Sequence, residues 1–416
     1  MTNTFAALGN RDYRLFWGAN FSMYISRWMQ MTTLSWFVLE RTNSAFNVGL
    51  IGFFGMVPFL VLGVFGGFLA DNLNKKRLII ITQFLTFFSA LIFLVLLIFD
   101  SVNYWYAYIA IVIPGIGWAL DMPSRRSVIM DIIGPSATTN GVALDSVGMH
   151  FSKMIGPAAA GALIAFEGVV GSYLLLTFVM MLGCFFVLMV NQPGSTSEVK
   201  LESHTTSESV IGQVLGNLLE GFKYAISNQA IVGVIVITVF MNLLLFPYMQ
   251  MVTVISREVL SVGPLLMGIL MSSDGLGALI GSTYIASRSD TKYQGRFFLY
   301  GSLLSLVALL IFAMSKWYLV SLPLLLILGM GTSGFGTMQS TIVLLVSKLE
   351  LRGRALGIVT LAIGAGPIGA LILGAVSESI GPSKGIFINA LIGLFLVGAS
   401  GLLIPAIRGR IEPNSI

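Results

Sequence analysis

Twelve long stretches with almost no charged residues occupy most of this sequence of 416 residues. A helix needs about 20 apolar residues to cross the hydrocarbon core of a bilayer, whereas strands of a membrane barrel alternate over about 10 residues. Only 10% of the residues are charged, against about 25% in soluble domains. We therefore predict an all-α integral membrane protein with twelve transmembrane helices. The expected spans are 15–39, 48–70, 78–99, 104–120, 141–166, 170–190, 230–255, 265–287, 297–314, 317–347, 355–376 and 385–407.

The positions of Lys and Arg predict the orientation of these spans, because cytoplasmic loops are enriched in both residues. An even number of spans places both termini on one side, and that side carries 17 of the 23 Lys and Arg residues. The opposite side carries only Arg41, Arg257, Lys316 and Lys384. We expect both termini in the cytoplasm. Topology then accounts for the net charge of +5, so the charge does not indicate a nucleic-acid partner.

One polar, Ser/Thr-rich stretch, "NQPGSTSEVKLESHTTSES", separates the sixth span from the seventh and is typical of a linker. After it, Ile211, Leu215, Leu218, Phe222 and Ile226 recur at helical spacing, which predicts an interfacial amphipathic helix. The expected domains are a six-helix bundle over 1–191, a cytoplasmic linker with this helix over 192–228, and a second six-helix bundle over 229–416.

The two halves repeat three short motifs in the same order and at similar offsets. The pairs are Gly63 and Gly67 with Gly277 and Gly281, Asp71 and Arg77 with Asp290 and Arg296, and Gly156-Pro157 with Gly366-Pro367. Such internal repeats are typical of secondary transporters, which bind substrate near the midplane between the repeats. We expect two pseudo-symmetric bundles.

Several of these motifs resemble those of the major facilitator superfamily, over nearly the whole chain. "GGFLADNLNKKR" is similar to the family's loop between helices two and three, and "KMIGPAAAG" is similar to the helix-five motif of its antiporters, with one final glycine where the full motif has two. "RDYRLFW", "WMQ", "ALDMPSRR" and "RGRALG" look most like the branch that includes enterobactin exporters and multidrug efflux proteins. The resemblance implies a cytoplasmic gate at Gly67, Asp71 and Arg77. It also implies a helix-five motif at Gly156, Pro157 and Gly161.

Four ionisable side chains, Arg27, Asp145, Lys153 and Asp274, fall inside the expected spans. A charge at a helix centre costs about 2.5 to 3.5 kcal/mol on insertion scales, so we expect these groups to face a cavity or one another. They are either structural ion pairs or a proton or substrate relay. Asp274 is the first candidate for a proton carrier, Asp145 is a relay or gate residue, and His150 is either a relay or a hydrogen-bonded packing residue. The first span has no central carboxylate, so the coupling ion stays open.

Polar and methionine side chains also lie at spacings of three and four in the first, fifth, seventh and eighth spans. In the family these helices line the central pathway, and methionine adapts to varied ligands. The expected substrate cavity comprises Asn20, Tyr24, Arg27, Gln30, Met149, Lys153, Asn242, Phe246, Met249, Met267 and Met271.

We predict a secondary active transporter that exports small amphipathic compounds, of drug or siderophore type, across a prokaryotic inner membrane by alternating access, with proton antiport. Alternatives are a transporter of lysophospholipids or lipid-linked substrates with the same fold, and a receptor without turnover. No enzyme motif lies in a suitable context, and neither a metal nor a cofactor is expected. The expected partners are the substrate, protons and membrane lipids, with the protein as a monomer.

Overall fold

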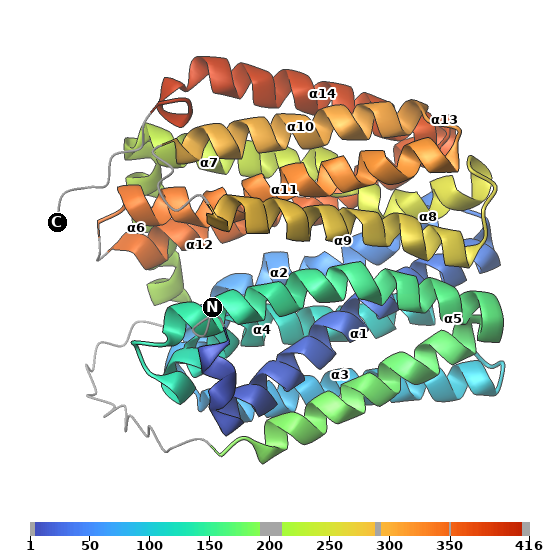
Figure 1. Ribbon diagram of the computed structural model, residues 1–416. Helices are drawn as coiled ribbons and strands as arrows, with labels where there is room; N and C mark the ends of the chain where they lie inside the picture. The colour runs from blue at the N-terminus through green and yellow to red at the C-terminus, as the bar shows by residue number, and fades with distance from the viewer. Residues whose placement is uncertain (1–4, 192–209, 288–292, 349–350, 410–416) are drawn as a thin grey trace.

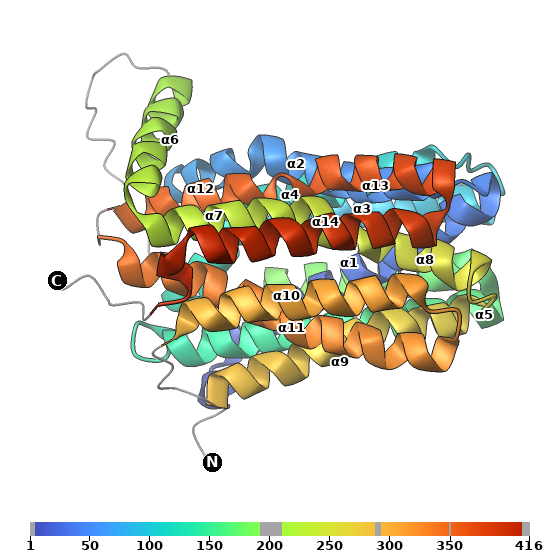
Figure 2. The same ribbon diagram turned by 90° about the horizontal axis from the view of Figure 1, so that it is seen from above.

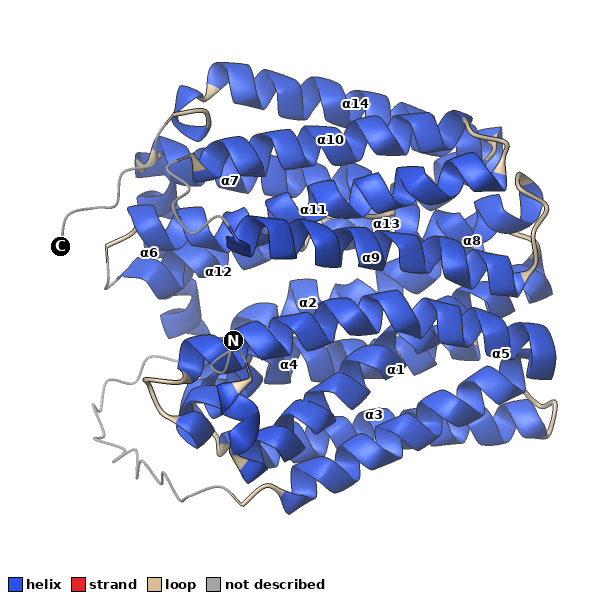
Figure 3. Cartoon of the chain, in the orientation of Figure 1, coloured by secondary structure: helices blue, strands red, loops and turns tan. Residues whose placement is uncertain are grey.

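The computed structural model describes residues 5–191, 210–287, 293–348 and 351–409, and within α2 and α6 it does not describe the side chains of 64–72, 210–215 and 217–218. Every regular element in these ranges is a helix (Figures 1 and 3). Before the linker lie η1 (Ala6–Gly9), α1 (Arg11–Thr42), α2 (Ala45–Asn72), α3 (Lys75–Ile98), α4 (Tyr106–Ile133) and α5 (Thr138–Met189). After it lie α6 (Val210–Ser227), α7 (Gln229–Phe240), η2 (Met241–Leu245), α8 (Tyr248–Glu258), α9 (Pro264–Ser287), α10 (Gln294–Met314), α11 (Tyr318–Val346), α12 (Arg352–Ile363), α13 (Gly366–Ile380), α14 (Pro382–Leu403) and η4 (Pro405–Ile407).

Ten helical segments in the described ranges are long and apolar enough to cross a membrane. One of them, α5, consists of two legs that meet at Gly168, where φ is 71° and the helical path breaks. The helix α1 is 32 residues long and runs beside the others (Figure 1). Its many polar residues make it too polar to be among these ten segments, but its length suffices to cross the membrane. The twelve predicted transmembrane helices are confirmed on this count.

Local sequence signals fix several helix ends. Asn10 and Asn228 cap α1 and α7 by accepting hydrogen bonds from the first backbone N–H groups, as asparagine commonly does at this position. A five-residue π-helical turn, η2, interrupts the seventh span just before Pro247. The eleventh span is broken between α12 and α13, at Gly364 and Ala365. Both breaks change the register in which later side chains face the bundle.

The helices form two groups that lie side by side, with both termini at the same end (Figure 1). Within the first group α1 packs on α5 and α2 packs on α4, whereas in the second α11 packs on α9 and α10. The two most extensive contacts between the groups are those of α5 with α9 and of α2 with α13. The site between the groups therefore depends on these two seams.

One predicted boundary is wrong. The expected fourth span ends at 120, which puts Arg125 and Arg126 outside the spans, among the cations of the cytoplasmic side. In the structure α4 continues to Ile133, and Arg125 is buried inside the first group whereas Arg126 is exposed. The charged segment continues the helix because Asp121 and Arg125 lie one turn apart and pair with each other.

Candidate functional site

A buried ion pair joins the two helix groups. The Nζ of Lys153, on the first leg of α5, lies 2.8 Å from the Oδ2 of Asp274 on α9, and their side chains are 14% and 4% exposed. The hydroxyl of Tyr248, at the start of α8, donates a 2.6 Å hydrogen bond to the same oxygen. The other oxygen, Oδ1, is buried and has no hydrogen-bond partner among the described residues. Asp274 thus keeps one free acceptor beside a cation.

These three residues line a small pocket between the groups. Its remaining walls are mostly apolar, and Lys153 also lies over the ring of Trp28, 5.6 Å from the ring centroid. Apolar walls around a few convergent polar groups are typical of small-molecule sites. The lining comprises Trp28, Lys153, Pro157, Tyr248, Met249, Val252, Met271, Asp274 and Leu325.

The glycines of the helix-five motif allow the close approach of α5 to its neighbours. A Cβ on Gly161 would overlap the carbonyl oxygen of Pro264 and come within 2.9 Å of the Cα of Gly268 on α9. A Cβ on Gly156 would come within 2.7 Å of the Cβ of Trp28 on α1. Gly161 therefore permits contact between the groups, whereas Gly156 permits contact within the first group.

A second polar cluster lies inside the first group. Asp145 accepts hydrogen bonds from the Nδ2 of Asn20 at 2.8 Å and from the hydroxyl of Tyr24 at 2.9 Å. The Oδ1 of Asn20 accepts a 2.8 Å hydrogen bond from Arg125, whose guanidinium also pairs with Asp121 at 2.8 Å. Among the described residues, this chain of contacts joins α1, α4 and α5 and does not reach the second group.

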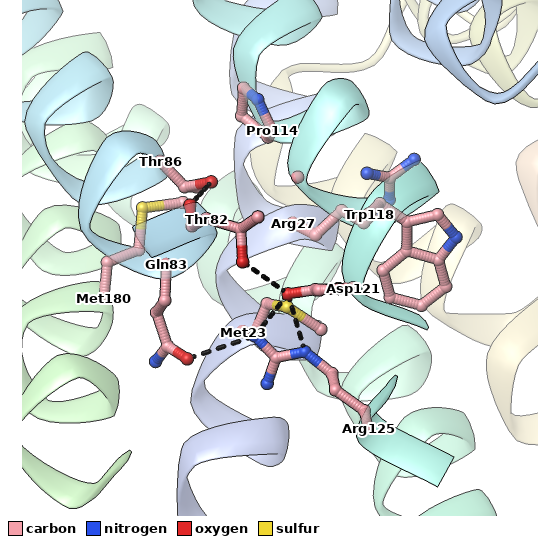
Figure 4. A pocket seen from close by; sticks show the side chains of 11 residues that line it. Met23, Arg27, Thr82, Gln83, Thr86, Pro114, Trp118, Asp121, Arg125 and Met180 are labelled. Atoms are coloured by element: carbon pink, nitrogen blue, oxygen red, sulfur yellow. Dashed lines mark hydrogen bonds and ion pairs between the residues drawn. The ribbon is translucent and has the colours of Figure 1, made fainter. Parts of the chain in front are cut away.

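Arg27 lies beside this cluster, in a pocket between α1, α3, α4 and the second leg of α5. Its guanidinium carbon is 4.9 Å from the ring centroid of Trp118. Figure 4 shows Arg125 joined to Asp121 and Gln83, whereas no marked interaction reaches Arg27. Arg27 therefore faces the interior of the first group and lines a different pocket from Lys153.

The remaining cavity candidates fall into two classes. Met249 and Met271 line the pocket between the groups, and the half-buried Met149 and His150 precede Lys153 on α5. The others pack within one group. Gln30 donates to the carbonyl of Ala110 and the hydroxyl of Tyr173, Asn242 donates to the carbonyl of Thr238, Phe246 contacts the ring of Phe335, and Met267 is fully buried.

The predicted cytoplasmic gate falls largely outside the described side chains. Gly67 and Asp71 lie in the helical backbone of α2, within the segment 64–72, whose side chains the structure does not describe. Arg77 is exposed in the first turn of α3, and its backbone N–H donates to the side chain of Asn74. The gate assignment stays a prediction.

Sequence reasoning missed three residues of these clusters: Asp121, Arg125 and Tyr248. The spacing of four between Asp121 and Arg125 was an available signal, since this spacing favours ion pairs on a helix. Tyr248 follows the π-helical turn η2, so a simple period of 3.6 does not predict which way it faces.

Further polar contacts between the groups lie at the end away from the termini. Glu378 at the end of α13 accepts hydrogen bonds from the hydroxyl of Ser44 and the backbone N–H of Phe46. Arg257 at the end of α8 donates to the carbonyl of Leu39. These contacts join the groups at that end in the part of the chain that the structure describes, whereas the Lys153–Asp274 pair lies near the middle of α9 and of the first leg of α5.

Two curated relatives are transporters. The chain is 24% identical over 391 residues to "Multidrug efflux pump Tap" of Mycolicibacterium fortuitum, and the match covers 90% of each chain. It is 31% identical over 153 residues to "Staphyloferrin A transporter" of Staphylococcus aureus (strain NCTC 8325 / PS 47). This second match covers 36% of the present chain and 38% of that transporter.

Solved structures agree on the fold. A D-xylose–proton symporter superposes with a TM-score of 0.75 at 13% identity, covering 95% of this chain and 98% of that one. A bacterial homologue of the human lysosomal transporter Spinster gives 0.69 at 13% identity, covering 96% and 98%. Residues 2–410 match the family described as "Transmembrane secretion effector". The chain therefore belongs to this family of multi-pass membrane transporters within the major facilitator superfamily.

Proposed function

We propose that this transporter exports small amphipathic compounds by alternating access, and that export is coupled to proton uptake through Asp274. The observation that carries this proposal is the Lys153–Asp274 pair, which joins the two helix groups within the pocket. An ion pair between two bodies that move apart has to break in each cycle. A proton on Asp274 removes the charge that holds Lys153, so protonation and separation of the groups would be linked.

The free Oδ1 of Asp274 supports antiport over symport. A cargo group that donates a hydrogen bond or carries positive charge would bind this oxygen in its ionised form, and a proton on the carboxyl would oppose that binding. Proton and cargo would then occupy the site in turn, which is the requirement for exchange. Met249 and Met271, which line the same pocket, supply flexible apolar contacts for varied cargo.

The relatives support the direction and the location. One is named a multidrug efflux pump and the other a staphyloferrin A transporter, and both belong to bacteria. We propose a bacterial inner membrane with both termini in the cytoplasm, on the bias in Lys and Arg. On that orientation the structure is closed on the outer side. We retain the division into bundles over 1–191 and 229–416, joined by the linker, and a monomeric state.

Asp145 and His150 are assigned secondary roles in proton movement. Asp145 lies two helical turns before Lys153 and already accepts two hydrogen bonds. His150 precedes Lys153 by three residues on the same helix. Either residue could pass a proton between the end of the bundle that carries the termini and the pocket.

The test uses purified protein in proteoliposomes with an imposed pH gradient and a trapped pH dye. The panel contains cationic drugs, macrolides, catecholate siderophores and lysolipids. Proton flux that depends on one compound class, accompanied by movement of that compound, is the expected result. Compound movement that is indifferent to the pH gradient would contradict proton coupling, and movement of lysolipids alone would favour the lipid-transporter alternative.

A further inference from the structure

The amphipathic helix α6 presents a largely exposed apolar face. Leu219, Phe222 and Ile226 are 63%, 55% and 58% exposed, and their spacing of three and four puts them on one side of the helix. Exposed large apolar residues gathered on one face indicate a binding surface. The predicted residues Ile211, Leu215 and Leu218 belong to the same helix, but their side chains are not described.

The opposite face of α6 is fixed to the second helix group. Glu220 forms an ion pair with Arg354 in the first turn of α12, and a Cβ on Gly221 would come within 3.0 Å of the carbonyl of Arg354. The hydroxyl of Tyr224 accepts a 3.1 Å hydrogen bond from the backbone N–H of Lys348, just after α11. These contacts hold the helix in one orientation, so its exposed face has a defined direction.

The position of α6 coincides with a membrane surface. Its partners are the last turn of α11 and the first turn of α12, where two transmembrane helices leave the bilayer. Figure 2 shows α6 at the end of the molecule that carries both termini, across the axes of the other helices and projecting beyond them. A helix in this position lies along the bilayer surface, within reach of lipid.

The charge around α6 indicates which lipids. Together, α6 and the segment 348–354 carry four basic residues, Lys223, Lys348, Arg352 and Arg354. They carry two acidic residues, Glu220 and Glu350, and the placement of Glu350 is not described. Lys223 and Lys348 are exposed, and the buried Nε of Arg352 has no hydrogen-bond partner among the described residues. Basic residues beside a transmembrane helix attract anionic headgroups.

We infer that α6 and the start of α12 form a binding site for anionic phospholipid, with Leu219, Phe222 and Ile226 in the acyl region and the cations at the headgroup. This inference does not depend on the cargo or on proton coupling. Because α6 is attached to α12, which belongs to the eleventh span, the bound lipid would also hold that span at the membrane surface.

The test measures the depth of α6 in full-length protein reconstituted into vesicles. Phe222→Cys, in a Cys184→Ser background, carries an environment-sensitive fluorophore, and Ser227→Cys is the matched control at an exposed position off the apolar stripe. Vesicles contain either phosphatidylcholine alone or equal parts of phosphatidylcholine and phosphatidylglycerol, each with a spin-labelled lipid quencher. We expect lipid quenching at 222 several-fold stronger than at 227, and stronger in the anionic vesicles.

Charge variants separate the two parts of the inference. Lys223→Gln with Lys348→Gln is expected to remove the preference for anionic vesicles while quenching in phosphatidylcholine persists, whereas Arg126→Gln, an exposed arginine elsewhere, leaves the preference intact. The site would be overturned if a water-soluble quencher, and not the lipid quencher, quenched the fluorophore at 222 in both kinds of vesicle. It would also be overturned if neither quencher reached the fluorophore at 222. Equal lipid quenching with and without phosphatidylglycerol would overturn the headgroup assignment.

Discussion

The two polar clusters use the same kinds of residue but differ in what they join. The cluster of Asn20, Asp121, Arg125 and Asp145 lies within one helix group, and its members keep their distances when that group moves as a body. The cluster of Lys153, Tyr248 and Asp274 joins both groups, so any separation of the groups changes it. We therefore propose a structural role for the buried ion pair in the first case and a coupling role for the pair in the second, on the basis of what each pair joins.

The largest expected effect comes from breaking the cluster within the first group. Arg125→Leu leaves Asp121 charged and buried at 1% exposure, and removal of one partner of a buried pair costs about 3 to 5 kcal/mol. We expect a marked loss of thermal stability in detergent. The neighbouring Arg126→Leu removes an exposed arginine and is the control. Equal stability of the two variants would show that the cluster is not structural.

Lys153→Met breaks the pair between the groups and should act on conformation more than on folding. Asp274 loses its cation, so the closed arrangement at the end away from the termini becomes less favourable. The measurement places a cysteine at Met271 and adds an impermeant thiol reagent from that side. We expect the rate of labelling to rise about 100-fold, which corresponds to a loss of about 2.7 kcal/mol in the stability of the closed arrangement.

Lys75→Met is the matched control for this change. Lys75 pairs with Asp131 at 3.0 Å, but both residues belong to the first group. Its loss should leave labelling at 271 unchanged. Comparable increases for both variants would mean that the position of an ion pair does not distinguish its role.

A smaller effect is expected where the helices of the two groups touch without charge. Gly161→Ala forces α5 away from α9, and overpacking of this kind costs about 1 to 3 kcal/mol. We expect the rate of labelling at the same engineered cysteine at 271 to rise about 10-fold, because the closed arrangement becomes less stable. In Gly398→Ala, where a Cβ meets nothing within 4 Å, labelling should not change. Unaltered closure in Gly161→Ala would contradict a close seam at this point.

The sequence predicted the helical class and the number of spans. It also singled out Lys153 and Asp274 as candidates, because charge inside a long apolar stretch is a strong signal, and the structure brings the two together in one pocket. It did not predict their pairing, since positions 153 and 274 come together only through the packing of α5 on α9. The first-span stripe of Asn20, Tyr24, Arg27 and Gln30 is helical, as expected. Asn20, Tyr24 and Gln30 form hydrogen bonds within the first group, and Arg27 lies over the ring of Trp118 in that group. The sequence could not show this, because the period of a helix shows which residues share a face but not which neighbour that face meets.

The seventh span shows a different limit. Asn242, Phe246 and Met249 have helical spacing in the sequence, but the π-helical turn η2 shifts the register between them. Phe246 packs against Phe335 while Met249 reaches the pocket. Pro247 was the available hint of this break. Tyr248, directly after it, was missed for the same reason.

The most direct test of the coupling role compares Asp274→Asn with Asp145→Asn in proteoliposomes. The measured quantity is proton uptake per compound moved, under the same imposed pH gradient. We predict that Asp274→Asn lowers compound-dependent proton uptake by about 100-fold or more, the size expected for a positioned proton-transfer group. Compound binding should become weaker but stay measurable, because the ionised acceptor is lost while the apolar walls of the pocket remain. Asp145→Asn should reduce the rate and keep the coupling. Unchanged uphill transport by Asp274→Asn would contradict the proposed mechanism.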